Sequence, residues 1–240
     1  MPKNFKLYLM IFFLDFDGVI VDSIEECFQV SFKTYYKNKN FSYDKKKYKN
    51  LFYDNRGLVK PPYEYFILHS AIENFLRFGK KSVESIFQSS LDLISNQEKE
   101  DFEKSFFSIR SSLMEKDFES WALMNPLTQF GKKLVSKDKS NLFIVTTKNF
   151  EATKALLDYY EIDVEEIHSN KEIKAARTKG NLISNIILEK NIDNAIFIDD
   201  ACEHLDSVQN PRVQCFFADW GYGKNNNNHR VFDIKNFKLK

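Results

Sequence analysis

The residues FFLDFDGVIVDS, at positions 12–23, constrain the fold of this chain more than any other stretch. An apolar run over positions 7–14 stops abruptly at Asp15, and Asp17 and Gly18 follow before apolar residues return. A short apolar run of this kind is typical of a strand that is buried on both faces, as in a parallel sheet. Two carboxylates at the end of such a strand repel each other, so the pattern indicates a site that needs both.

Three later stretches have the same character, namely NLFIVTT at 141–147, NAIFIDD at 194–200 and VQCFFAD at 213–219. Helical patterns flank the first two, and Leu182, Ile186 and Ile187 form one such apolar face. Strands that alternate with helices predict an α/β fold with a doubly wound, Rossmann-like parallel sheet.

The middle of the chain has a helical pattern without a convincing strand. Ile24, Cys27 and Phe28 begin an apolar face at helical spacing, and Ser23 and Glu26 have the spacing of a capping box. The prolines in RGLVKPP, at 56–62, mark the clearest break between helices. We therefore expect residues 1–22 and 120–240 to form the α/β core domain, and residues 23–119 to form an inserted, all-helical cap domain.

Charge and cysteine content narrow the class of partner and the compartment. The formal net charge is +1 and no basic face is concentrated in the sequence, so neither nucleic acid nor an anionic membrane surface is an expected partner. The three cysteines are scattered, which favours a reduced, intracellular protein. The apolar run at 7–14 is too short for a membrane span and ends in Asp15, so we expect a cytoplasmic location.

Acidic or hydroxyl side chains follow three of the predicted strands: Asp15 and Asp17, Thr146 and Thr147, and Asp199 and Asp200. Because ligands of parallel sheets gather at the carboxyl ends of the strands, we expect these side chains to meet at one edge. Several carboxylates in one place must be partly protonated or have a cation between them, and carboxylate oxygens with no histidine or cysteine nearby suit Mg²⁺. Magnesium commonly shares its site with a phosphate group, so a phosphorylated substrate is the expected partner.

These stretches resemble, in order along the chain, the motifs of the haloacid dehalogenase (HAD) superfamily of phosphohydrolases and phosphotransferases. DFDGVIVDS closely matches the first motif, LFIVTTK resembles the second and IFIDD resembles the acidic fourth motif. Lys179 suits the lysine of the third motif, and WGYG at 220–223 resembles phosphoglycolate-phosphatase-like members. The helical segment resembles the cap that the superfamily inserts between its first two motifs.

The resemblance implies a role for each matched residue. Asp15 would be the nucleophile that forms an aspartyl-phosphate, and Asp17 would be the general acid and then the general base. Thr146 and the backbone of Thr147 would hold phosphoryl oxygens, and Lys179 would neutralise charge on the transferred group.

The resemblance also implies the surroundings of the reacting atoms. Gly18 would let the backbone turn away from the strand. Magnesium would be held by Asp15, the carbonyl of Asp17 and an acid of the fourth motif. We favour Asp200 as the direct ligand and Asp199 as the outer one.

Several assignments have competitors within the sequence. Lys171 and Lys174 compete with Lys179 for the third-motif position, and His204 occupies a position where the fourth motif often has an acid. Lys148 is expected at the surface or in an indirect, supporting position.

Arg56 and Lys60 flank a glycine at the break in the cap, and they are candidates to bind a distal anion of the substrate. A solvated loop is the alternative interpretation of these two residues.

The expected function is that of a Mg²⁺-dependent phosphatase, which hydrolyses a small phosphorylated metabolite through an aspartyl-phosphate. A large cap argues against a macromolecular substrate, because it would cover the site. The alternative is a sugar phosphomutase, similar to β-phosphoglucomutase, that returns the phosphoryl group to the substrate. A non-catalytic binding protein on the same fold is disfavoured, because the set of matched residues is intact.

Overall fold

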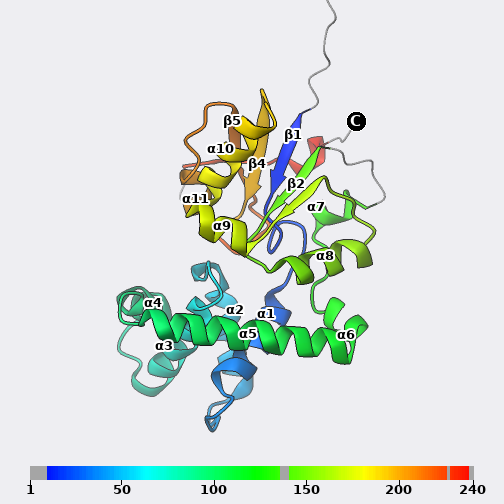
Figure 1. Cartoon of the computed structure of the whole chain (residues 1–240). Coiled ribbons are helices and arrows are strands. Elements are labelled where there is room, and N and C mark those ends of the chain that lie inside the picture. The colour runs from blue at the N-terminus through cyan, green and yellow to red at the C-terminus, as the bar shows by residue number, and fades with distance from the viewer. Residues whose placement is uncertain (1–9, 136–140, 226–227, 238–240) are drawn as a thin grey trace, which may run out of the picture. The chain divides into compact units, whose positions relative to one another are not determined.

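The computed structural model describes residues 10–135, 141–225 and 228–237 of the chain. It divides into two compact units, which we call the sheet unit (Met1–Val21 and Leu127–Lys240) and the helical unit (Asp22–Pro126). Figure 1 shows the strands gathered in the first unit and a group of helices in the second. The predicted cap, residues 23–119, lies within the helical unit, which continues to Pro126.

Within the described residues, six parallel strands form one sheet in the order β3-β2-β1-β4-β5-β6. The strands are β1 (Ile11–Leu14), β2 (Leu142–Val145), β3 (Glu166–His168), β4 (Ala195–Asp199), β5 (Val213–Phe217) and β6 (Arg230–Val231). This arrangement confirms the predicted α/β class with a parallel sheet. Positions 7–9 of the predicted first strand lie outside the described residues.

The register of the three central strands aligns their carboxyl ends. Leu14 of β1 lies opposite Ile144 of β2 on one side and Ile198 of β4 on the other. Asp15 therefore leaves the sheet at the same level at which β2 and β4 end. The side chains that follow these strands share one edge of the sheet, as the sequence predicts.

Helices and a short terminal turn cover both faces of this sheet. They are α7 (Gln129–Lys132), α8 (Phe150–Tyr159), α9 (Asn170–Ala176), α10 (Lys179–Glu189), α11 (Cys202–Asp206) and η2 (Ile234–Asn236). Phe13 belongs to a buried cluster with the apolar face of α10, whereas Phe12, on the opposite face, packs edge-on against Phe237. Burial on both faces explains why the strands have continuous apolar sequences.

The helical unit has a core of its own. Its elements are α1 (Ile24–Tyr35), α2 (Lys45–Asp54), η1 (Arg56–Leu58), α3 (Glu64–Phe78), α4 (Val83–Ser90), α5 (Asn96–Lys116) and α6 (Phe118–Ala122). Aromatic rings dominate the buried cluster, and Phe28, Phe52 and Phe106 are shielded from solvent. All residues of this unit are described and none forms a strand, which confirms the predicted all-helical character.

The predicted capping box at the start of α1 is wrong, although the helix begins where the pattern places it. Ser23 makes no side-chain hydrogen bond that caps α1. Glu26 is fully buried and accepts two hydrogen bonds from Arg110 of α5, at 2.7 and 2.9 Å. The indole nitrogen of Trp121 donates to the same carboxylate at 3.3 Å. Arg110 and Trp121 therefore contact the carboxylate that a capping box would direct at the backbone of Ser23.

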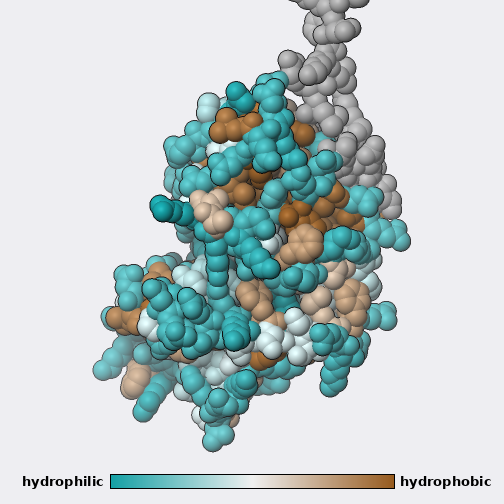
Figure 2. Space-filling model, viewed as in Figure 1, coloured by the Kyte–Doolittle hydropathy of each residue, from teal (hydrophilic) through white to brown (hydrophobic). Residues whose placement is uncertain are grey.

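The surface visible in Figure 2 is mainly hydrophilic, with apolar side chains in small groups. Exposed large apolar residues occur in both units, for example Leu93 and Leu188. Among the described residues, no helix combines the length and the apolar character that a membrane span requires. Cys27, Cys202 and Cys215 are all free thiols.

Candidate active site

The chain turns sharply where β1 ends, and this turn carries the aspartate pair. The backbone nitrogen of Asp15 donates to the carbonyl of Ile198 at 2.9 Å, which continues the pairing with β4 by one residue. Gly18 has a φ of +86°, and a Cβ built there would lie 2.5 Å from Oδ2 of Asp200. Both the left-handed backbone and the close approach of a carboxylate require a glycine at this position.

Lys179, the first residue of α10, joins two acids from neighbouring strands. Its Nζ lies 2.8 Å from Oδ1 of Asp15 and 2.8 Å from Oδ2 of Asp199, and all three side chains are buried. The competing residues Lys171 and Lys174 are exposed on α9. The structure thus brings Lys179 against the predicted nucleophile, and its role in the reaction stays a prediction.

The two acids at the end of β4 have different surroundings. Asp199 accepts a hydrogen bond from the backbone nitrogen of Ala201 at 2.8 Å, and Nδ1 of His204 lies 3.1 Å from both of its carboxylate oxygens. With Lys179 on Oδ2 as well, donors of the chain itself surround Asp199. Such an acid is suited to hold its neighbours in place.

Asp200 lies between the turn that carries Gly18 and the WGYG stretch at 220–223. Its Oδ2 accepts a hydrogen bond of 2.5 Å from the backbone nitrogen of Tyr222, within the WGYG stretch. A Cβ on Gly221 would lie 2.3 Å from the Cβ of Asp200, so this glycine also admits the acid. The WGYG stretch therefore forms part of the wall around Asp200, a contact that the sequence pattern did not reveal.

Burial and crowding shift the pKa values of this cluster. Burial raises the pKa of Asp15 to about 8; Lys179 opposes this shift, and the neighbouring Asp199 and Asp200 add to it. Burial alone would raise the pKa of Asp199, but Lys179 and His204 outweigh it and lower that pKa. Burial likewise disfavours the charged form of Lys179, yet Asp15 and Asp199 raise its pKa. The ammonium and Asp199 are therefore ionised, whereas Asp15 needs further positive charge nearby to be ionised at neutral pH.

Asp17 has a partner that the sequence analysis did not assign. Nζ of Lys148 lies 3.0 Å from Oδ1 of Asp17, and the side chain of Lys148 is fully shielded from solvent. Of the two expected positions for Lys148, the surface position is wrong, because its residue exposure is only 2%, and the indirect, supporting position stays a prediction. A signal was present in the sequence, since Lys148 directly follows the two threonines that end a buried strand.

Thr146 is buried at the same edge and is held by β3 and by its own loop. Its backbone nitrogen donates to the carbonyl of His168 at 2.9 Å, and its Oγ1 accepts from the backbone nitrogen of Lys148 at 3.1 Å. Thr147, the next residue, is half-buried. The structure gives both threonines the strand-end position that the sequence predicts.

Arg56 and Lys60 lie in the helical unit, around the short η1 turn. Arg56 donates to the carbonyl of Val59 at 3.0 Å, and its guanidinium carbon lies 5.2 Å from the ring centre of Tyr65. Nζ of Lys60 donates to the carbonyl of Gly57 at 2.8 Å. These contacts order the turn, and substrate binding by the two residues remains a prediction.

The acids at the sheet edge fit a hard divalent cation. Ligand atoms of Asp15, Asp199 and His204 all lie within 4.8 Å of one another, so the expectation of no histidine near the acids is wrong. Asp200 adds a third buried carboxylate beside them. Carboxylate oxygens are the ligands that Mg²⁺ prefers. Burial contributes most to the raised pKa of Asp15, and the neighbouring Asp199 and Asp200 raise it further, so added positive charge would favour the ionised form of Asp15. The residues present therefore suit Mg²⁺.

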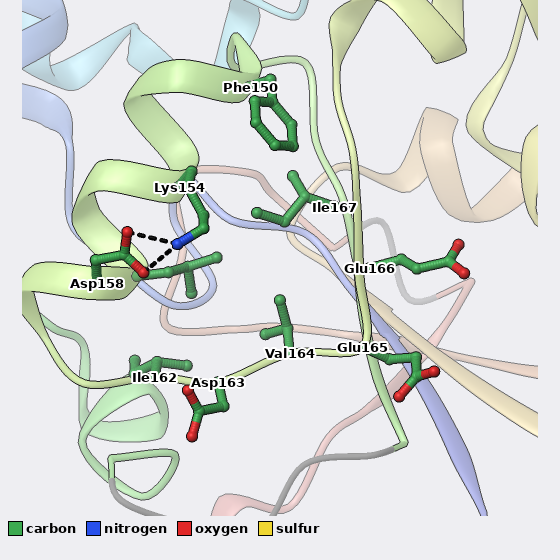
Figure 3. Close-up of a pocket in the computed structure, with 10 residues that line it drawn as sticks. Phe150, Lys154, Asp158, Ile162, Asp163, Val164, Glu165, Glu166 and Ile167 are labelled. Atoms are coloured by element: carbon green, nitrogen blue, oxygen red, sulfur yellow. Dashed lines mark hydrogen bonds and ion pairs between the residues drawn. The ribbon is translucent and has the colours of Figure 1, made fainter.

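A separate groove of about 290 Å³ lies between α8 and the segment that leads into β3. Figure 3 shows Phe150, Val164 and Ile167 in this groove, with Lys154 directed at Asp158. Its acidic lining residues are Asp158, Asp163, Glu165 and Glu166. Because acids outnumber the one lysine, which is already paired, the groove is poorly suited to a phosphate group. None of the predicted site residues lines it.

Comparison with known proteins was informative only at the level of structure. No family model and no curated protein matches this sequence. A protein from Bacteroides fragilis, described as a haloacid dehalogenase-like hydrolase, has a TM-score of 0.63 at 13% identity, and the match covers 94% of this chain and 95% of that one. A haloacid dehalogenase-like hydrolase from Streptococcus pneumoniae has a TM-score of 0.60 at 18% identity, over 94% and 95% of the two chains.

A third similar structure comes from Clostridium acetobutylicum and is described as a predicted phosphatase. It has a TM-score of 0.54 at 16% identity, and the match covers 95% of each chain. At these identities the likeness concerns the fold alone. This chain has the fold of the haloacid dehalogenase-like hydrolases, as its motifs predict.

Proposed function

We propose that this protein is a Mg²⁺-dependent phosphatase that hydrolyses a small phosphomonoester through an aspartyl-phosphate. The observation that carries the proposal is the position of Lys179, whose Nζ lies 2.8 Å from both Asp15 and Asp199. This ammonium and the strand-end acids meet at the edge where parallel sheets bind ligands. The description of similar structures as hydrolases and a phosphatase supports the same conclusion.

The proposed reaction has two halves. A carboxylate oxygen of Asp15 attacks phosphorus, the bond between phosphorus and the leaving oxygen breaks, and that oxygen takes a proton from Asp17. Asp17 then takes a proton from a water molecule whose oxygen attacks phosphorus, and the bond from phosphorus to Asp15 breaks. Inorganic phosphate leaves, and both aspartates return to their starting forms.

The remaining residues position and neutralise the phosphoryl group. Thr146 and the backbone of Thr147 would donate to its oxygens, and Lys179 would offset their negative charge. Asp15, the Asp17 carbonyl and Asp200 would hold Mg²⁺, which when bound supplies the positive charge that three crowded acids and a phosphate require. Asp199, surrounded by its own donors, would act as the outer acid.

The test is a screen of phosphorylated metabolites, each with Mg²⁺ and with a chelator, read out as released inorganic phosphate. We expect release from a subset of small phosphomonoesters and none once the metal is removed. Release that is unaffected by the chelator would contradict the metal requirement, and no release from any ester would contradict the phosphatase proposal. Conversion of a hexose 1-phosphate into its 6-phosphate without release would indicate the mutase alternative.

A further inference from the structure

Among the described residues of the sheet unit, Lys148 and Lys179 are the buried lysines, and each contacts a different member of the aspartate pair. Nζ of Lys179 lies 2.8 Å from Oδ1 of Asp15, and Nζ of Lys148 lies 3.0 Å from Oδ1 of Asp17. Both lysine side chains are completely shielded from solvent. Burial of an ammonium group is costly unless an acid compensates it, so each lysine position depends on its aspartate.

The backbone of Lys148 is fixed from two directions. Its nitrogen donates to Oγ1 of Thr146 at 3.1 Å, and its carbonyl accepts from the backbone nitrogen of Asn170 at 3.3 Å. The ammonium group is therefore held by the loop that follows β2. The backbone position of Lys148 therefore does not depend on the turn that carries Asp17.

Asp17 itself lies on the turn after β1, outside the regular strand. Its side chain is 14% exposed, and its backbone forms an isolated bridge with Val21. A carboxylate on a turn has access to several rotamers, and only some of them direct an oxygen at the leaving group. The contact with Lys148 ties this carboxylate to β2, the strand beside β1.

We propose that Lys148 is a positioning residue that orients Asp17 for proton transfer, an inference that rests on the proposed phosphatase function. The contact between the ammonium of Lys148 and Oδ1 fixes the orientation of the carboxyl group that protonates the leaving oxygen. The same orientation serves the second half of the reaction, in which Asp17 takes a proton from the attacking water. Lys148 forms and breaks no covalent bond in either half.

The inference predicts an effect that depends on the leaving group. Benzyl phosphate and p-nitrophenyl phosphate are similar in size, but benzyl alcohol is a far weaker acid than p-nitrophenol and needs a proton to leave. The ratio kcat/KM reports steps up to formation of the aspartyl-phosphate, so hydrolysis of that intermediate does not enter it. Lys148→Met should lower kcat/KM about 100-fold for benzyl phosphate and less than about 10-fold for p-nitrophenyl phosphate.

A double-mutant cycle tests whether the effect passes through Asp17. Asp17→Asn should produce the same selective loss on benzyl phosphate, and Lys148→Met should add no further selective loss in that background. The matched control is Lys154→Met, which removes an exposed lysine paired with Asp158. It should change kcat/KM by no more than about twofold for either ester. Thermal melting of each variant reports folding, and Lys148→Gln gives the same comparison if Lys148→Met does not fold.

The outcomes separate this inference from the proposed function. An equal loss on both esters would overturn it, because a lysine that contacts the phosphoryl group, or serves only the fold, affects both. Unchanged values on both esters would overturn it as well. If the wild-type protein releases phosphate from neither ester nor from any metabolite in the screen, the phosphatase proposal is wrong. The inference about Lys148 is then wrong too, because it rests on that proposal.

Discussion

Each unit contains a buried cluster of charged side chains, and the cluster around Asp15 differs from the one around Glu26 in its charge balance. In the sheet unit, Asp15 and Asp199 contact the ammonium of Lys179, and Asp200 lies close enough to Asp15 to raise its pKa. In the helical unit, Glu26 and Arg110 form one matched pair, and Trp121 adds a further hydrogen bond. One cluster has an excess of negative charge, whereas the other is balanced within the chain.

This difference indicates which buried charges serve function and which serve the fold. A balanced pair needs nothing from outside, so Glu26 and Arg110 tie α1 to α5 and need no ligand. An unbalanced group of acids stays costly until a cation arrives. The excess of acids at the sheet edge is therefore consistent with a site that binds a metal and a phosphate, and four predictions test the contrast.

The largest expected effect is on turnover, from a change to the unbalanced cluster. Asp15→Asn should lower kcat by at least about four orders of magnitude, because the amide cannot attack phosphorus. The melting temperature of the metal-free protein should be unchanged or higher, since the amide adds no charge to buried acids. Steady-state kinetics and calorimetry measure both quantities, and near-normal turnover would show that Asp15 is not the nucleophile.

A change to the balanced pair of Glu26 and Arg110 should instead lower the free energy of unfolding. Arg110→Met leaves the carboxylate of Glu26 buried without its counter-charge, so it should destabilise the helical unit by about 3–5 kcal/mol. Urea unfolding is followed by tryptophan fluorescence in a Trp220→Phe background. Trp121 is then the sole tryptophan, so the signal reports the helical unit alone.

The double variant Glu26→Leu/Arg110→Met should recover most of that loss, because no buried charge remains. Gln97→Ala, which removes an exposed hydrogen bond to Asp101 within the same unit, should cost no more than about 0.5 kcal/mol. A loss from Arg110→Met as small as this control would contradict the importance of the buried pair.

The two acids at the end of β4 should differ in their effect on the metal. Asp200→Asn should raise the Mg²⁺ concentration for half-maximal activity at least about 100-fold, whereas Asp199→Asn should raise it about 10-fold and lower kcat by displacing Lys179. Titration of activity with Mg²⁺ measures both shifts. The reverse order would assign direct metal binding to Asp199.

The smallest expected effect concerns pH and the helical unit. Burial lowers the pKa of His69 from its ordinary value of 6.5 to about 3, and Lys39 adds to the shift. The ring lies 2.8 Å from the hydroxyl of Tyr48 and 2.9 Å from that of Ser31. Between pH 3 and 6.5 the unfolded chain binds a proton that the folded chain does not, so stability falls as pH falls through this window.

The slope should reach about 1.4 kcal/mol per pH unit below pH 6.5 and vanish above it. Urea unfolding of the helical unit at pH 5.0, 6.0 and 7.5 measures the slope, with His69→Gln as the control that lacks the titrating ring. Equal slopes in the two proteins between pH 5.0 and 6.0 would contradict the assignment to His69.

The sequence predicted β1, β2, β4 and β5 and the residues at their ends, because both depend on local patterns, but it did not predict the short strands β3 and β6. Apolar runs that end in Asp15, Thr146 and Asp199 mark buried parallel strands, and parallel strands bring their carboxyl ends to one edge. The helical unit was equally readable from its apolar spacing and from the prolines at 61 and 62. The order of these elements along the chain already specified the α/β sheet and the helical insertion.

Only the tertiary structure decided which charged groups meet. Lys148 and Asp17 are 131 residues apart, and Glu26 and Arg110 are 84 residues apart. The spacing of Ser23 and Glu26 predicted a helix cap, yet Glu26 pairs with Arg110, which is distant in the sequence. Periodicity reports the neighbours of a residue within its own helix or strand, whereas the partner of a buried charge depends on which elements pack together.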